Sequence, residues 1–182
     1  YIDDDGVMSV SSFVSVDKMA YEGCKIGDVA SEFVYMPREG GNEHCVDGTF
    51  SVDDYEVCTL SGTYVTSGFG HLSADVQLQR TPLLLLNGFM PDRLLNFKGY
   101  ADGHVKVDGQ LNRLDVDGEL MFDSAYVASE PYGVEMRLCD DPVTITDSKM
   151  QFENFQLFAR NGNPLTLYGN VDFADMSNMT MY

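Results

Sequence analysis

Carboxylates are the most frequent side chains in this sequence that could do chemistry. Asp3, Asp4 and Asp5 precede Gly6, which is how a calcium-binding loop can begin. An EF-hand loop places its carboxylates at alternate positions and closes with a glutamate at the twelfth, where this chain has Val14. The spacing therefore does not predict a calcium site.

A second set of carboxylates follows one segment at nearly alternate positions, namely Asp115, Asp117, Glu119 and Asp123. A glycosidase uses two such groups, held in environments that separate their roles as acid and base. Nothing in the neighbouring sequence distinguishes one of these carboxylates from the others, so we expect a solvated strand face. A hydrolase with an acidic cleft stays open as an alternative.

Histidine and cysteine are the remaining metal-capable side chains. His44 and Cys45 are adjacent, but consecutive residues of a strand point to opposite faces and cannot easily share a metal ion. The cysteines are too widely spaced for a zinc site, and buried free thiols, one disulfide and a reactive thiol all remain open. They are Cys24, Cys45, Cys58 and Cys139.

No nucleophile elbow, phosphate loop or dinucleotide fingerprint occurs in the sequence. The chain is therefore predicted to have no catalytic residues, no metal ion and no cofactor, and not to be an enzyme.

Composition narrows the classes of partner. The 182 residues carry 29 acidic against 11 basic side chains, for a formal charge of -18, and 44% of them are apolar. Such a charge repels phosphate backbones, which argues against nucleic-acid binding, while the apolar content is enough to fill a core. No apolar run approaches the 18 to 20 residues of a membrane helix. We expect an excised piece of one elongated domain, with any anchor outside it.

The elements that must position these side chains are strands. In residues 72–79 the even positions are apolar and the odd positions polar, which is typical of a strand with one dry face. The same alternation recurs around Leu114, Val134 and Leu165. Strands of a parallel sheet would read as continuous apolar runs, so the pattern predicts an all-β, antiparallel-rich sheet.

Local signals add turns, a bulge and one helix. Gly40-Gly41, Asp147-Ser148 and Asn161-Gly162 are predicted to be turns, the last as a two-residue hairpin. The apolar spacing slips at Asn154, which indicates a bulge. Thr81-Pro82, followed by four leucines and Gly88, predicts a short helix with proline at its first position, buried on all sides.

Glycines inside the predicted strands suggest that the sheet is strongly bent. They are Gly99, Gly103, Gly109, Gly118 and Gly169. Taken from the residues alone, the dry face is either a closed core or a trough that stays partly open to an apolar ligand.

An ordered set of motifs resembles a known family. The set consists of the leucine helix followed by glycine-punctuated strands, at residues 82–91, 99–109, 114–120, 125–127, 142–152 and 162–171. In this order, and best between residues 81 and 173, it resembles the C-terminal domain of the TamB family in the wider AsmA-like group. Residues 1–44 match no motif of that family, and we expect them to be further strands of the same sheet.

The resemblance implies a long curled sheet, shaped like a taco, with an apolar interior and one short helix. Members of the family lie in the periplasm of Gram-negative-type bacteria, are anchored in the inner membrane, and are thought to pass phospholipid to the outer membrane. The implied partners are phospholipid acyl chains and an outer-membrane barrel protein of the BamA-like (TamA-type) class.

The residues expected to line the lipid groove are those of the dry face. They are Leu114, Val116, Leu120, Phe122, Val134, Met136, Leu138, Leu165, Leu167, Val171 and Phe173. Two alternatives stay open beside lipid conduction: a chaperone-like role in assembly of outer-membrane barrels, and a closed-core structural or adhesin-like module.

Overall fold

The structure is a computed structural model, which describes residues 8–21, 24–38, 40–89, 95–172, 174 and 180–181. Within these residues the chain forms twelve strands of one sheet and one short 3-10 helix, η1 (Leu83–Phe89). The strands are β1 (Val10–Tyr21), β2 (Cys24–Pro37), β3 (Glu43–Val52), β4 (Tyr55–Val65), β5 (His71–Pro82), β6 (Asn96–Gln110), β7 (Arg113–Ser129), β8 (Val134–Leu138), β9 (Val143–Thr146), β10 (Lys149–Ala159), β11 (Pro164–Asp172) and β12 (Thr180–Met181). The predicted all-β class is confirmed.

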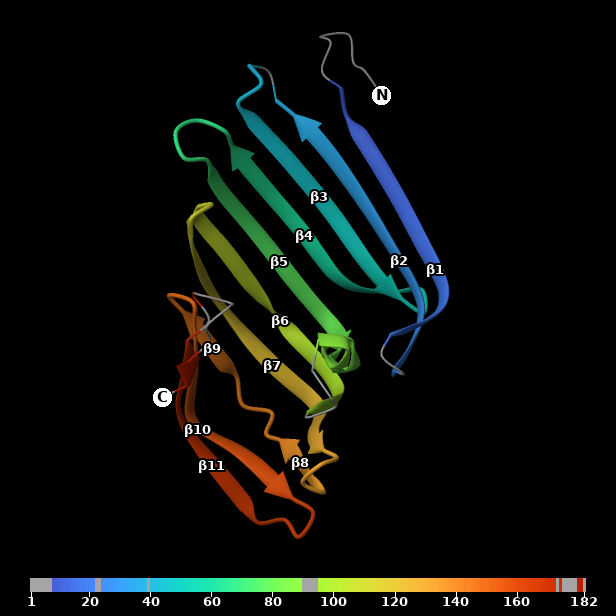
Figure 1. The fold of residues 1–182 in the computed structure, drawn as a ribbon, viewed down its shortest axis with the longest axis vertical. Helices are drawn as coiled ribbons and strands as arrows, with labels where there is room; N and C mark the ends of the chain where they lie inside the picture. The colour runs from blue at the N-terminus through green and yellow to red at the C-terminus, as the bar shows by residue number, and fades with distance from the viewer. Residues whose placement is uncertain are drawn as a thin grey trace.

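The strand order follows the chain. Each of β1 to β7 pairs antiparallel with the next, and Figure 1 shows them side by side as one broad sheet. The far side of β7 then pairs with both β8 and β9, which pair in turn with β10, followed by β11 and β12. Residues 1–44 were expected to add strands to this sheet, and their described part does so as β1, β2 and the start of β3.

Period-two alternation sorts the side chains into two faces, because partners in an antiparallel ladder point the same way. One row runs across five strands through Leu60, Val76, Val105 and Gly118 to Ile145. We call the side of this row the apolar face. The opposite side, which carries the row Ser61, Asp75, Lys106 and Asp117, is the polar face.

The sheet curls around its apolar face at the C-terminal end. Phe122 of β7 and Phe155 of β10 meet edge to face, with ring centroids 6.1 Å apart. Phe155 belongs to a buried core, and Phe122 packs against it. The other members of this core are Leu83, Ala101, Ala125, Leu138, Cys139 and Val143. Figure 1 shows β8 to β11 turning away from the plane of the first strands at this end. The curled antiparallel sheet predicted from the sequence is therefore present.

Two strand glycines permit this curvature. A Cβ atom on Gly103 would collide with the carbonyl oxygen of Glu119 on β7, and one on Gly118 would collide with that of His104 on β6. The two backbones thus approach more closely than any side chain at these positions would allow.

The predicted turns occur, with one correction. Gly40-Gly41 and Asp147-Ser148 join their strands with positive φ, and Asn154 forms the expected bulge in β10 at φ 58°. The hairpin at Asn161-Gly162 is not a two-residue loop. The Ala159 amide donates to the Asn163 carbonyl (3.1 Å), so the loop has three residues and Gly162 alone supplies its positive φ.

The predicted helix is present but differs from its description. Pro82 ends β5 instead of opening the helix, and η1 is a 3-10 helix. Leu83 is buried in the core, whereas Leu86 is 43% exposed, so the expectation of burial on all sides is wrong. A 3-10 helix repeats every three residues, so four consecutive leucines cannot all face one surface. Asn87 fixes the helix to β6 by accepting from the Phe97 amide (2.6 Å) and donating to its carbonyl (3.0 Å).

Candidate functional site

The apolar face stays open over the first half of the sheet. In the described part of the chain every strand belongs to the one sheet, and η1 contacts it at β2 and β6. No second sheet covers β3 to β5 there, and most of the side chains on their apolar face are half-buried. We call this region the open face, and it consists of Phe33, Tyr35, Val46, Leu60, Leu72, Val76, Val105 and Val107.

Phe33 shows how exposed this region is. Its side chain is 40% exposed, and its ring covers Gly48 of the neighbouring strand, where a Cβ atom would collide with it. A large aromatic ring that lies flat on a glycine and faces solvent offers apolar surface to a ligand.

The ten described residues of the predicted groove all lie on the apolar face. The register pairs Val116 of β7 with Val107 of β6, and Leu114, two residues from Val116, points to the same face. The pairing of β9 and β10 with their neighbours relates the later strands to this face in the same way. They are Leu114, Val116, Leu120, Phe122, Val134, Met136, Leu138, Leu165, Leu167 and Val171. Phe173 lies outside the described residues.

Their surroundings differ, however, along the sheet. Leu138 is part of the C-terminal core, and Phe122 and Leu167 pack against that core. Leu165, at the opposite extreme, is 48% exposed beside the β10–β11 turn. The curled end is thus partly filled by its own side chains, and the open apolar surface lies mainly on β2 to β6.

Part of the open face was visible in the sequence. The alternation of residues 72–79 marks Leu72 and Val76 as dry-face residues. Val46 and Leu60 were missed because glycines interrupt their strands: Gly48 replaces the next apolar residue of β3, and Gly62 the next one of β4. The register with neighbouring strands supplies the signal that their own spacing lacks.

Three polar aromatic rings border the open face at one end of the strands. His44 of β3 stacks between Tyr35 of β2 and Tyr64 of β4, with ring centroids 5.8 and 6.2 Å apart. The Tyr35 hydroxyl lies 2.6 Å from Nδ1 of His44. Rings with an apolar body and a polar tip suit a boundary between apolar surface and water. Cys45 pairs with Thr63 on the opposite face, so His44 and Cys45 do not share a site.

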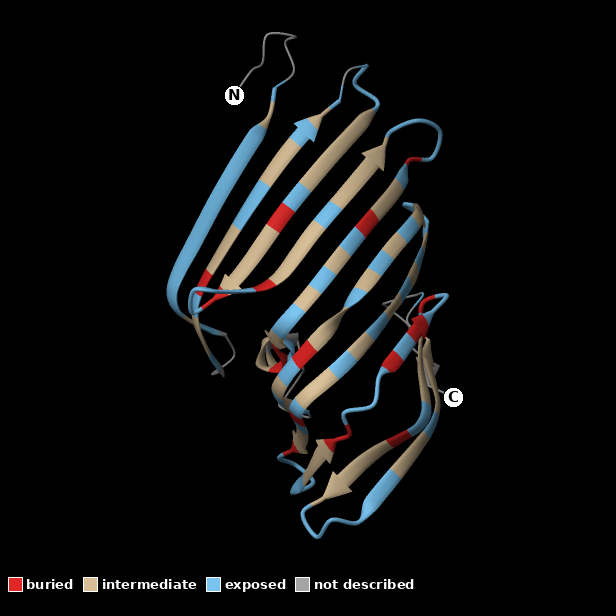
Figure 2. Cartoon of the chain, turned by 180° about the vertical axis from the view of Figure 1, so that it is seen from behind, coloured by how far each residue is buried: buried red, intermediate tan, exposed pale blue. Residues whose placement is uncertain are grey.

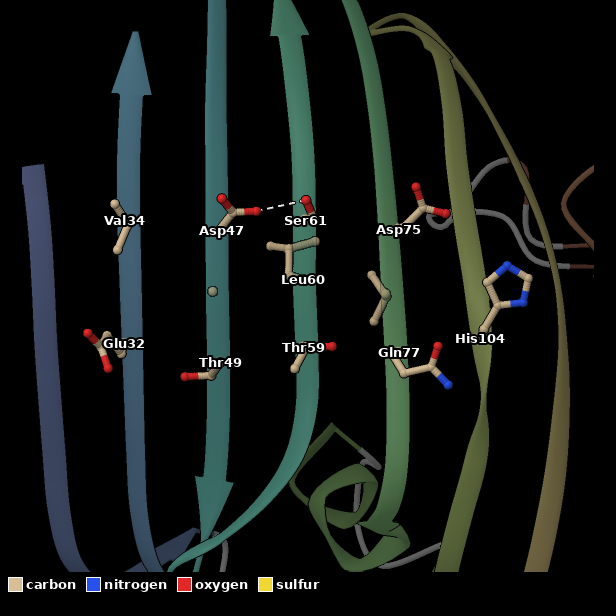
Figure 3. A pocket seen from close by; sticks show the side chains of 12 residues that line it. Glu32, Val34, Asp47, Thr49, Thr59, Leu60, Ser61, Asp75, Gln77 and His104 are labelled. Atoms are coloured by element: carbon tan, nitrogen blue, oxygen red, sulfur yellow. Dashed lines mark hydrogen bonds between the residues drawn. The ribbon is translucent and has the colours of Figure 1, made fainter. Parts of the chain in front are cut away.

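The polar face carries a hollow of 390 Å³ over β2 to β6. Figure 3 shows the short side chains of Thr49, Thr59 and Ser61 on neighbouring strands, with Asp47 and Asp75 beside them. The Ser61 hydroxyl donates to Asp47 at 2.7 Å. His104, which also lines this hollow, lies on β6, two strands and therefore about 10 Å from β4. The hydroxyls of Thr59 and Ser61 on β4 therefore form no nucleophile–base pair with the His104 imidazole.

A larger hollow of 670 Å³ lies on the same side, where β4, β5 and β6 meet. Arg80 borders it with a positive φ of 45° and stacks 4.4 Å above the ring of Tyr100. Its guanidinium donates to Asp123 at 2.8 Å. Hydrogen bonds from Ser124 and Arg80 lower the pKa of Asp123, and Asp123 raises the pKa of Arg80. The Arg80–Asp123 pair joins β5 to β7 beside a bulge and therefore has a structural role.

The other predicted carboxylates line none of the three hollows described in this structure. Asp115, Asp117 and Glu119 are exposed on the polar face of β7, and Figure 2 shows exposed segments alternating along these strands. Asp117 accepts a hydrogen bond from the Asp147 amide (3.1 Å), so it holds the β9–β10 turn. Among the described residues no group of three histidine, cysteine or acidic side chains is placed to hold a metal ion. The run 3–6 lies outside the described residues.

The cysteines whose side chains are described are free thiols. Cys45 and Cys58 are half-buried, and Cys139 is buried in the C-terminal core. Burial raises the pKa of Cys58, which disfavours the reactive thiolate. Cys139 accepts a hydrogen bond from the Gln156 amide at 3.2 Å and so links the end of β8 to β10.

Comparison with known proteins adds no relative: no family model, no curated protein and no solved structure matches the chain. The resemblance to the TamB family therefore stays a prediction. No helix in the described residues is long and apolar enough to cross a membrane.

Proposed function

We propose that the open face binds the acyl chains of phospholipids, and that the chain is a piece of a TamB-like protein that conducts phospholipid between the inner and outer membranes. In this proposal the protein acts in the periplasm of a Gram-negative-type bacterium, is anchored in the inner membrane outside this chain, and has a BamA-like barrel protein as its outer-membrane partner. It performs no catalysis.

One observation carries the proposal: an apolar surface continues across five strands, and within the described residues no second sheet lies over it. Burying a methylene group there is worth about 0.8 kcal/mol, so ten methylenes of one acyl chain would contribute about 8 kcal/mol before the costs of association. A phospholipid headgroup at the edge of the strands would remain in water.

The two faces also divide the roles that lipid conduction needs. The apolar face meets the acyl chain, while the polar face carries carboxylates on β3, β5 and β7 that keep the sheet in solution.

Native mass spectrometry with lipid extraction tests the proposal. Leu60 and Thr59 are neighbours on β4 that point to opposite faces, so Leu60→Arg and Thr59→Arg add the same charge to the same strand. We expect phospholipid to copurify with the wild type and with Thr59→Arg, and to be lost at least tenfold from a folded Leu60→Arg, because a guanidinium on the open face must be desolvated by the acyl chain.

A wild type that carries no lipid, or equal lipid on the two variants, would contradict the proposal. Leu120→Arg is a weaker choice of variant because Leu120 pairs with the buried Val143 of β9 and its replacement risks unfolding.

A second candidate rests on the edge of the sheet. Within the described residues, β1 is the first strand of the order and pairs only with β2, so a row of backbone donors and acceptors is left along its other side. Phe13 on this strand is 69% exposed. An edge of this kind can accept an extended strand by β-augmentation, as a chaperone for outer-membrane strands would.

A further inference from the structure

Three of the eleven basic residues gather at one corner of this acidic molecule. Lys98 near the start of β6 and Arg160 in the β10–β11 turn flank the carboxylate of Glu135, and Arg137 on β8 lines the same cavity as Glu135 and Arg160. The ammonium nitrogen of Lys98 lies 4.0 Å from Glu135 and the nearest guanidinium nitrogen of Arg160 lies 3.8 Å from it. This corner is on the polar face, where Arg137 pairs with Tyr126 of β7 and Phe158 of β10.

The cations of the corner are only loosely neutralised. Both separations from Glu135, and the 4.0 Å between Arg137 and Asp140, exceed the length of a hydrogen bond. The Arg137 guanidinium donates a long hydrogen bond, 3.5 Å, to the Leu138 carbonyl. Most of the guanidinium donors therefore remain available to a ligand.

The position of Arg137 is fixed by stacking. Its guanidinium carbon lies 4.7 Å from the ring centre of Phe158, so the planar group is held against the aromatic face and presents its donors at the edge. Holding a guanidinium in place before a ligand arrives reduces the conformational entropy lost on binding.

A cavity lies between these groups. It has a volume of 260 Å³ and is lined by Tyr126, Glu135, Arg137, Phe158, Ala159, Arg160 and Gly162. Two guanidiniums thus border one space, with the Lys98 ammonium behind Glu135.

We propose that this corner, the cationic corner, binds the phosphate group of a phosphate ester. A phosphate accepts paired hydrogen bonds from a guanidinium fork, and three positive charges against the carboxylates of Glu135 and Asp140 give the corner a local excess of +1 in a chain of charge -18. The overall charge repels anions at long range, so the attraction acts only close to the corner and weakens with salt. The site lies on the face opposite the acyl-binding surface and does not depend on it.

Isothermal titration of the folded protein with sn-glycerol 3-phosphate at low salt tests the site, alongside cosedimentation with vesicles of phosphatidylglycerol or of phosphatidylcholine. We expect saturable binding that is about tenfold weaker in Arg137→Gln, because a charge-assisted hydrogen bond is lost. Glu135→Gln removes the internal competitor and should bind severalfold more tightly. Binding should stay within twofold of the wild type in Arg113→Gln, which removes an exposed arginine in β7 near the β6–β7 turn.

The two probes distinguish the source of the phosphate. Binding of free glycerol 3-phosphate assigns the site to a soluble phosphate ester, whereas Arg137-dependent binding only to phosphatidylglycerol vesicles assigns it to a lipid headgroup. The proposal is overturned if the wild type binds neither probe, or if Arg113→Gln weakens binding as much as Arg137→Gln. Either of these results leaves the lipid test on Leu60 untouched.

Discussion

At the scale of single residues, Ser148 secures the curl of the sheet. Its side chain is 1% exposed, and its hydroxyl accepts from the Val116 amide (3.1 Å) and donates to the Leu114 carbonyl (3.4 Å). The Ser148 amide donates to the Val116 carbonyl at 2.9 Å. Ser148, in the β9–β10 turn, therefore supplies hydrogen-bond partners for backbone groups of β7 that would otherwise lie unpaired at an edge.

Ser148→Ala should lower the free energy of unfolding by about 1 to 3 kcal/mol, because it leaves the half-buried Val116 amide without an acceptor. Urea denaturation measures the loss, and hydrogen exchange should be faster at the Val116 amide than in the wild type. Ser61→Ala is the control, since the exposed Ser61 hydroxyl donates to an exposed carboxylate. A Ser148→Ala variant as stable as Ser61→Ala would contradict this role.

The role of Ser148 could not be predicted from the sequence, although its turn could. Asp147-Ser148 has the composition of a two-residue turn, which is a local property. Burial of the hydroxyl depends on a strand more than thirty residues earlier, and no short-range pattern reports it. The same holds for Gly103, whose place in a bent strand was expected but whose contact with Glu119 was not.

At the scale of elements, β1 decides between the two candidate functions. Consecutive residues of an antiparallel strand point their amides alternately toward and away from the partner strand. Of Val14→Pro and Ser15→Pro, one therefore keeps the ladder with β2 and removes a donor from the outer edge. If the edge accepts strands, that variant should stay folded by circular dichroism and lose binding of a synthetic peptide copied from an outer-membrane barrel strand.

Leu60→Arg serves as the control for the edge, because it alters the open face and should still bind the peptide. Equal peptide binding by the wild type and by the folded proline variant would exclude β1 as the docking edge.

Most strands could be predicted from the alternation of apolar and polar residues, but β1 could not. Strict alternation marks β5, β7 and β11, because one of their faces is dry and the other wet. In β1 the consecutive Phe13 and Val14 are both exposed and lie on opposite faces, so alternation is lost where a strand has water on both sides. The helix was predicted at nearly the right place, with Pro82 wrongly as its first residue, and its 3-10 form was not predicted, since capping signals do not distinguish the two kinds of helix.

At the scale of the whole molecule, the curl separates a filled end from an open one. Alternation assigns Val76 and Leu138 equally to a dry face, yet Leu138 is enclosed by β10 and Val76 is not. Which part of the face closes depends on how β8 to β10 return against β7, a property of topology that spacing does not encode. The predicted groove residues therefore lie on the right face, while the open surface extends onto strands that were not included.

Site-specific photo-crosslinking of the chain in cells tests the central claim most directly. Val76 and Gln77 are neighbours on β5 that point to the apolar and the polar face, and each can be replaced by p-benzoylphenylalanine in turn. The account predicts that irradiation links phospholipid to the protein from position 76 and not from position 77. Equal crosslinking from both positions, or none from position 76 in a folded protein, would contradict an acyl-binding apolar face.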